Sequence, residues 1–184
     1  MDLLILFFVL SVSVSFLCSI LESVLLSVNM SYISVLEQKK PRVAAYLRSH
    51  KENINKSIAS ILILNTIANT LGAAAVGAQA SILFGNDAVV YVSIVLTFAI
   101  LFFSEIIPKT IGAIYWKELA PISARIIRIF IFLTYPIILS TLFVTNRISK
   151  GKENAHSLTK EELLHSMLLS EDDGIIDEKE SDFI

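Results

Sequence analysis

The sequence predicts an all-α integral membrane protein with three transmembrane helices, a juxtamembrane bent helical hairpin or belt, and cytoplasmic amphipathic helices. Of its 184 residues, 54% are hydrophobic and only 17% are charged, and the mean hydropathy of +0.70 is too high for a soluble domain of this length. The charges are segregated into residues 37–56, 109–128 and 147–182, which leaves long apolar runs between them. No basic face remains for nucleic acid, so we expect no nucleic-acid partner.

The first apolar run, residues 3–28, predicts a transmembrane helix because it exceeds the roughly 20 residues that cross the hydrocarbon core. The chain opens with Met1 and Asp2 instead of a basic segment, so this run lacks the pattern of a cleavable signal peptide. Residues 38–56 follow, and they are rich in lysine and arginine with a single glutamate. This excess of positive charge predicts a cytoplasmic segment and therefore an N-terminus outside the membrane.

Two further apolar runs, residues 57–84 and 89–107, predict the second and third crossings. The short Gly85-Asn86-Asp87 turn between them carries no cation, as expected of an external loop. Lysines and arginines follow Pro108 within residues 109–128, so the chain returns to the cytoplasm there.

A fourth apolar run, residues 126–144, is long enough to span, but cations flank both of its ends, which favours the cytoplasm for both. Tyr135 and Pro136 lie in its middle, and proline removes a backbone donor and disfavours helix at the preceding residue. We therefore predict a bent helical hairpin, broken at this dipeptide and lying against the inner leaflet. A true fourth span is the alternative.

The composition divides the chain into a transmembrane domain, residues 1–150, and a cytoplasmic acidic helical segment, residues 151–184. Residues 159–162 precede leucines at helical spacing, which predicts a capped amphipathic helix. A second acidic element begins after Gly174, and the chain stops soon afterwards. We expect this segment to lead into a cytoplasmic domain that is missing from this chain.

Two carboxylates lie inside the predicted membrane helices, Glu22 in the first and Glu105 near the inner end of the third. An ionisable group in a bilayer costs roughly 3 kcal/mol or more, so each is a candidate functional residue. Lys109 stands four residues after Glu105, and an ion pair at the interface is the alternative explanation for that glutamate.

Serines recur every four residues on one stripe of the first helix, at Ser11, Ser15, Ser19, Ser23 and Ser27. Small residues at this spacing often only allow two helices to approach closely, and packing alone explains Ser11, Ser15 and Ser27. Ser19 and Ser23 flank Glu22, so for these two a role as ligands and a role in packing both remain open.

The second and third helices add further oxygen groups. Asn65 and Asn69 lie on one face of the second helix with Gly72 one turn further, which favours a site over a single interhelical hydrogen bond. In the third helix, Pro108 leaves the carbonyl of Ser104 without its usual helical donor. A freed carbonyl of this kind is a candidate ion ligand in a transporter.

Every group in this polar set offers oxygen, which is typical of a site for a hard cation. No histidine or methionine accompanies the membrane carboxylates, and the only cysteine, Cys18, is predicted to pack in an apolar run, so zinc, copper and nickel are not expected. Mg²⁺ prefers octahedral oxygen coordination and sheds water reluctantly, which would require a tightly built site. On chemistry alone, Mg²⁺, Na⁺ and Ca²⁺ all remain open.

Three blocks of this sequence resemble the transmembrane domain of the CNNM/CorC family of Mg²⁺ transporters, and the resemblance covers nearly the whole chain. The first helix carries a block similar to the family's Ser-Gly-Ser-Glu-Thr, namely Ser19-Ile20-Leu21-Glu22-Ser23. The second helix carries one similar to Gly-Asn-Asn-Leu-Val-Asn, namely Leu64-Asn65-Thr66-Ile67-Ala68-Asn69. The third carries the most specific one, similar to Gly-Glu-Val-Leu-Pro-Lys-Thr, namely Ser104-Glu105-Ile106-Ile107-Pro108-Lys109-Thr110. Ile20, Leu64 and Ser104 stand where the family usually has glycine.

The resemblance implies a homodimer in a bacterial-type inner membrane that exports Mg²⁺, with Na⁺ entry as the driving force. It implies one dehydrated Mg²⁺ per protomer between the helices, and a CBS-pair regulatory domain after the acidic segment. Carried over by position, the metal-binding residues would be Ser19, Ser23, Asn65, Asn69, Glu105 and Glu22.

Two other functions remain open at this point. A channel or importer would bind the same ion, because direction is not readable from residues that only bind. A membrane anchor that dimerises and senses Mg²⁺ for a cytoplasmic domain is an alternative of a different class. An enzyme is not expected, because His50, His156 and His165 lie in polar segments away from the membrane carboxylates.

Overall fold

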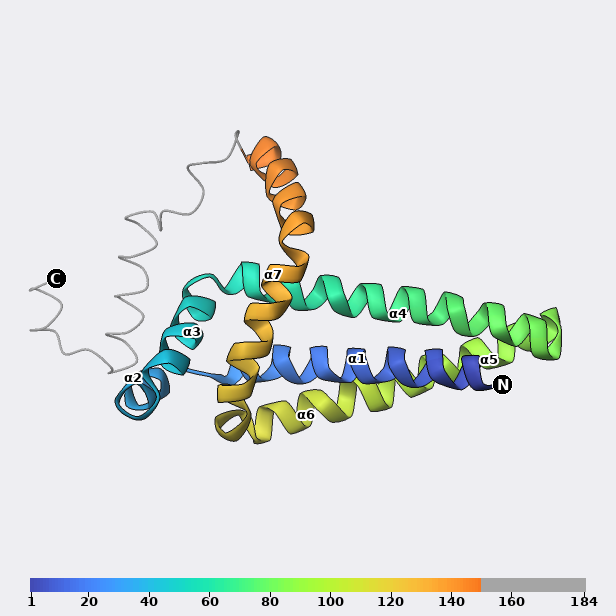
Figure 1. Cartoon of the computed structure of the whole chain (residues 1–184), viewed down its shortest axis with the longest axis horizontal. Helices are drawn as coiled ribbons and strands as arrows, with labels where there is room; N and C mark the ends of the chain where they lie inside the picture. The colour runs from blue at the N-terminus through green and yellow to red at the C-terminus, as the bar shows by residue number, and fades with distance from the viewer. Residues whose placement is uncertain (150–184) are drawn as a thin grey trace, which may run out of the picture. The chain divides into compact units, whose positions relative to one another are not determined.

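The computed structural model describes the backbone of residues 1–149 and the side chains of residues 1–140, and every regular element in this range is helical (Figure 1). Contacts divide the chain into two compact units, residues 1–140 and 141–184, and the packing described below is that of the first. The elements are α1 (Asp2–Ser27), α2 (Met30–Lys39), α3 (Pro41–Glu52), α4 (Ile54–Phe84), α5 (Asn86–Ala99), the π-helix η1 (Ile100–Ile106), α6 (Ile107–Ile114) and α7 (Trp116–Ser149). The predicted acidic helical segment, residues 151–184, lies outside the described residues.

Three long apolar rods lie side by side: α1, α4, and the continuous run of α5, η1 and α6 (Figure 1). α4 runs opposite to α1, and the third rod returns parallel to α1 after a tight turn at Gly85, whose φ of 87° suits glycine. All three are long and apolar enough to cross a membrane. The all-α, multi-pass membrane class predicted from the sequence is therefore confirmed.

The predicted break at Tyr135 and Pro136 is wrong, because α7 is one helix from Trp116 to Ser149 with Pro121 and Pro136 inside it. A proline already has a helical φ and removes one backbone hydrogen bond, whereas a hairpin would leave several backbone groups without partners in apolar surroundings. By length and composition, residues Trp116–Ser140 make a fourth candidate span. In Figure 1 this part of α7 runs across α1 and not alongside it, which is the direction expected of a juxtamembrane belt.

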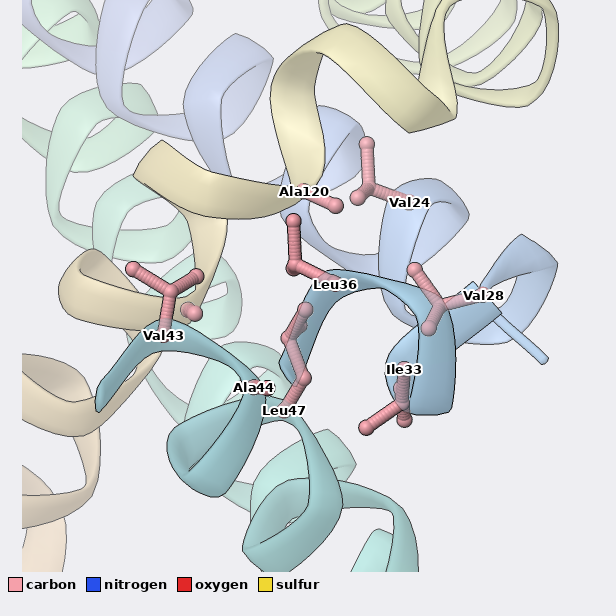
Figure 2. Packing of buried hydrophobic residues seen from close by; sticks show 9 residues of the cluster. Val24, Val28, Ile33, Leu36, Val43, Ala44, Leu47 and Ala120 are labelled. Atoms are coloured by element: carbon pink, nitrogen blue, oxygen red, sulfur yellow. The ribbon is translucent and has the colours of Figure 1, made fainter. Parts of the chain in front are cut away.

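A cluster of aliphatic side chains joins the end of α1 to α2, α3 and α7, and Figure 2 shows its members pointing toward one another. It consists of Val24, Val28, Ile33, Leu36, Val43, Ala44, Leu47, Ala120 and Ala124. Lys51 on α3 adds a polar link by donating from Nζ to the carbonyl of Leu25, 3.2 Å away, near the C-terminal end of α1. The basic stretch after α1 therefore forms the helical pair α2 and α3, which packs at the C-terminal end of α1.

A second cluster lies where α1, α4 and α7 meet, and it contains Cys18, Leu21, Leu25, Ile61 and Ile127. The Cys18 thiol is free and only 1% of the residue is exposed, which confirms the packing role predicted for it. Elsewhere along α1 and α4, Gly72 of α4 faces Ser11 of α1 so closely that a Cβ atom on Gly72 would overlap the Ser11 side chain. Close approach of α1 and α4 therefore depends on this glycine.

His50 is the one buried imidazole among the described side chains, and its Nε2 lies 3.0 Å from the carbonyl oxygen of Ala124 on α7. Burial lowers the pKa of His50 below its ordinary value, and the nearby Arg128 lowers it further, while the Ala124 hydrogen bond opposes them. The imidazole is therefore held neutral where α3 and α7 meet.

We expect Gly72→Ala to reduce the free energy of unfolding by about 1–3 kcal/mol, because the new methyl group overpacks the contact with Ser11. Gly77→Ala is the matched control on the same helix, since its Cβ would lie 3.8 Å from Val89 Cγ1, an ordinary contact. Both changes gain the same helix propensity. Thermal unfolding in detergent measures the difference, and equal stability of the two variants would contradict the close contact.

We expect the unfolding temperature to fall as the pH is lowered from about 7.5 through about 6.5, the ordinary histidine pKa. Because the folded chain has the lower His50 pKa, the unfolded chain binds the proton first, and acid favours unfolding. Replacing His50 with glutamine removes the titrating group, so the fall should be smaller in His50→Gln. The two melting curves are compared across pH, and an identical fall in both would show that His50 is not the cause.

Candidate cation site within the membrane helices

The serine stripe of α1 is divided between two neighbouring rods. Ser11 Oγ donates to the carbonyl of Ala68 at 3.0 Å, and Ser15 Oγ donates to Asn65 Oδ1 at 2.7 Å. Both serines are buried against α4, which agrees with the packing role predicted for them. Asn65 thus makes the interhelical hydrogen bond that the sequence left as one of two readings, although its amide oxygen keeps a second lone pair.

Of the remaining serines, Ser23 faces α6, whereas Ser27 Oγ donates to the carbonyl of Ser23 within α1 itself. Ser23 Oγ donates to the carbonyl of Lys109 at 2.6 Å, and Lys109 Nζ lies 3.4 Å from Glu22 Oε2. Gly112 permits this approach, because a Cβ there would lie 2.8 Å from Ser23 Cβ. Lys109 therefore pairs with Glu22 across helices and not with Glu105 four residues earlier.

Two oxygen atoms of the predicted set are buried without a hydrogen-bond partner in the described part of the chain. They are Ser19 Oγ on α1 and Asn69 Oδ1 on α4; a third such atom, Ser123 Oγ, belongs to α7 and was not predicted. A buried polar atom left unpaired costs about 1–3 kcal/mol. Such atoms require an explanation, and a bound ion or water is one of the usual ones.

Glu105 lies on a π-helical segment, residues Ile100–Ile106, where the N–H of Ile107 bonds to the carbonyl of Phe102 five residues back. The physical reason is Pro108, which has no N–H and whose ring would clash with the carbonyl four residues before it in an α-helix. The loosened backbone predicted at this place thus takes the form of a wider turn, a feature frequent at functional sites. Glu105 is half-buried and has no ion pair within residues 1–140.

Hydrogen bonds place these groups along α1. Ser104 Oγ donates to the carbonyl of Val12 at 3.0 Å, and Ser11 donates to Ala68, so the next residues, Glu105 and Asn69, lie at nearly one level of α1. Asn65 lies about one turn closer to the C-terminal end of α1, opposite Ser15.

Ser19 follows Ser15 by one more turn of α1, whereas Ser23 and Glu22 belong to the level of Lys109. Ser23 stands twelve residues beyond Ser11, which is roughly 18 Å along the helix axis. The predicted residues therefore fall into one group of Asn69, Glu105 and Asn65 near Ser11 and Ser15 and a second group of Ser23 and Glu22, and Ser19 lies midway between the two along α1. Within residues 1–140, Asn69 Oδ1 of the first group and Ser19 Oγ are the oxygens of this set that are buried without a hydrogen-bond partner.

No three His, Cys, Asp or Glu side chains within the described residues gather as a metal cluster would. A cation near Asn69, Asn65 and Glu105 would have mainly neutral oxygens and one carboxylate around it. That composition suits a hard cation more than a transition metal.

Sequence reasoning missed the cross-helix roles of three residues: the hydroxyl of Ser104, Lys109 as the partner of Glu22, and Gly112 as the contact for Ser23. In the sequence, only the small size of Ser104 and Gly112 indicates that another helix comes close to them, and it does not indicate which helix that is.

Residues 5–180 match the family described as the cyclin M transmembrane N-terminal domain. A UPF0053 protein of Synechocystis sp. is 29% identical over 168 residues, which are 91% of this chain and 48% of the relative.

Two further relatives are similar. A chloroplastic DUF21 domain-containing protein of Arabidopsis thaliana is 28% identical over 154 residues, covering 81% of this chain and 23% of the relative. A UPF0053 protein of Haemophilus influenzae is 28% identical over 117 residues, which cover 64% of this chain and 28% of the relative. The chain thus spans less than half the length of each curated relative it matches.

We expect a double-mutant cycle of Glu22→Gln and Lys109→Met to give a coupling energy of about 0.2–1 kcal/mol, the usual range for a partly exposed ion pair. The same cycle with Glu105→Gln in place of Glu22→Gln should give a coupling near zero. Free energies of unfolding in mixed micelles provide the measurement. A larger coupling energy for Glu105 than for Glu22 would show that Lys109 pairs with Glu105, four residues earlier on the same rod, and would contradict this geometry.

Proposed function

The chain belongs to the CNNM family of transmembrane domains, and on that premise we propose that it carries Mg²⁺ across a bacterial-type inner membrane as a Na⁺-coupled exporter. The active form would be a homodimer with the N-terminus outside and the C-terminus in the cytoplasm. Each protomer would hold one Mg²⁺ between α1, α4 and η1. A cytoplasmic regulatory domain would act on this unit.

One observation carries the proposal: Ser19 Oγ and Asn69 Oδ1 are buried within membrane helices without a hydrogen-bond partner in residues 1–140. A buried polar atom without a partner is unfavourable in apolar surroundings. A bound cation would therefore offset part of the solvation free energy that Ser19 and Asn69 lose when α1 packs against α4. Glu105 supplies a carboxylate at the level of Asn69, and it is not neutralised by Lys109. The three groups together offer oxygen ligands and one negative charge.

The ligand chemistry favours a hard divalent ion. Mg²⁺ accepts carboxylate, amide and hydroxyl oxygens, and neutral ligands leave the site with little excess negative charge to trap the ion. Binding that is favourable and yet reversible is what a transport site needs. Asn69 and Asn65 would bind through their side-chain oxygens, Ser19 through its hydroxyl, and Glu105 would provide the charge.

The π-helical segment supports movement of the ion. Glu105 lies within η1, where the wider turn is imposed by Pro108, and a shift between π- and α-helical pairing would move the carboxylate relative to α1. Release on the outer side would follow from such a movement. Ser23 and Glu22 lie further in with Lys109 and would form part of the entry path from the cytoplasm.

We expect Glu105→Ala and Asn69→Ala each to lower Mg²⁺ flux by about tenfold to a hundredfold, because each removes a charged or direct contact to the ion. Flux is measured in proteoliposomes with an imposed Na⁺ gradient and a Mg²⁺ indicator. Glu118→Ala and Asn55→Ala are matched controls, since both side chains are exposed and outside the candidate site.

Na⁺-dependent flux that both site substitutions abolish, and both controls keep, would support an exchanger. Unchanged flux in the site variants would exclude this site, and flux without Na⁺ dependence would favour a channel or importer. If no variant and no wild-type sample moves Mg²⁺ while the chain still dimerises, the sensing anchor becomes the better explanation.

A further inference from the structure

A polar pocket of about 420 Å³ lies on the basic side of the molecule, outside the candidate cation site. Residues from the end of α3, the start of α4 and the middle of α7 line it: Tyr46, Ser49, His50, Asn53, Lys56, Ser57, Arg128 and Ile131. Two of these residues are cations, and none is acidic. The pocket therefore has the charge and the hydrogen-bond donors of an anion site.

Both cations are held in place without a carboxylate. The Arg128 guanidinium lies 4.6 Å from the ring centre of Tyr46, and Lys56 Nζ lies 5.3 Å from that of Tyr135. The ion pairs found within residues 1–140 are Arg48 with Glu37 and Lys109 with Glu22, so neither Lys56 nor Arg128 is neutralised there. Two like charges on one pocket repel each other, and a bound anion would relieve that repulsion.

The position of the pocket favours a lipid as the source of the anion. Lys56 stands in the first turn of the membrane-spanning α4, so its charge lies where that helix enters the bilayer. Apolar surface adjoins the pocket on α7, where Ile131 lines it and the next residue, Phe132, is 83% exposed. An amphipathic ligand with a phosphate head and an apolar tail matches both features.

The geometry points to this pocket as a binding site for a phosphate group, occupied by the headgroup of an anionic phospholipid at the cytoplasmic surface. Lys56 and Arg128 would pair with the phosphate oxygens, and arginine is suited to two parallel hydrogen bonds with them. The acyl chains would lie against the exposed apolar side chains of α7. Basic pockets between helices on the cytoplasmic side are typical of such recognition. The site is independent of the transport proposal, because none of its residues belongs to the candidate cation site.

The test is native mass spectrometry of the detergent-purified chain titrated with phosphatidylglycerol and, separately, with phosphatidylcholine. We expect tighter binding of phosphatidylglycerol, and a loss of about fivefold or more in Lys56→Gln and in Arg128→Gln. Lys39→Gln is the control, since Lys39 is exposed and outside the pocket. The charge-preserving variants Lys56→Arg and Arg128→Lys should keep most of the preference, which separates lost charge from lost folding.

A preference that the two glutamine variants lose and Lys39→Gln keeps would establish the lipid site. Equal binding in wild type and both glutamine variants would overturn it, as would an equal loss in Lys39→Gln. A third titration uses inorganic phosphate as competitor. If millimolar phosphate binds and displaces the lipid without any preference for phosphatidylglycerol over phosphatidylcholine, the pocket takes a free anion and the lipid assignment is wrong.

Discussion

The close contact of α1 with its two neighbouring rods is the constraint on which the rest of the structure depends. Lipid offers no hydrophobic gain for bringing apolar helices together, so association rests on shape and on interhelical hydrogen bonds. Small side chains on α1 meet glycines, Ser11 at Gly72 and Ser23 at Gly112, and this lets the backbones approach. The hydroxyls then bind α4 and α6 directly. A bulkier residue at these crossings would separate the helices that carry every candidate ligand.

That contact also decides which oxygens are free. Ser15 Oγ donates to one lone pair of Asn65 Oδ1, while Lys109 accepts from Ser23 through its carbonyl and pairs with Glu22 through Nζ. The bonds that fix the helices thus use part of the polar set and leave Ser19 Oγ and Asn69 Oδ1 buried without a hydrogen-bond partner within residues 1–140. The proposed ion site would then be formed by oxygens that the packing of the helices leaves without a partner in the described residues, and not by a separate cluster of charged ligands. This explains how a membrane domain whose three apolar runs contain only two carboxylates, Glu22 and Glu105, could bind a divalent cation.

The short helices α2 and α3 hold the transmembrane rods together at the C-terminal end of α1. α2 and α3 pack with α7 around the end of α1, and the buried His50 ties α3 to the backbone of α7. The same junction creates the basic pocket with Lys56 and Arg128. One side of the junction therefore stabilises the helices, while the other offers a surface on which anionic lipid could bias their arrangement. Any movement of α4 or α7 would alter both.

The sequence by itself determined the membrane class, the three rods and the packing roles of Ser11, Ser15 and Cys18. It also located the loosened backbone before Pro108. These features follow from hydropathy, residue size and the missing proline donor, which act locally. Only the tertiary structure decided that Lys109 pairs with Glu22, that α7 continues through Pro136, and that Ser19 and Asn69 each keep an oxygen without a partner among residues 1–140. Each of these depends on which side chains meet from helices far apart in the sequence, or on the cost of unpairing backbone in apolar surroundings, and neither is encoded in a local pattern.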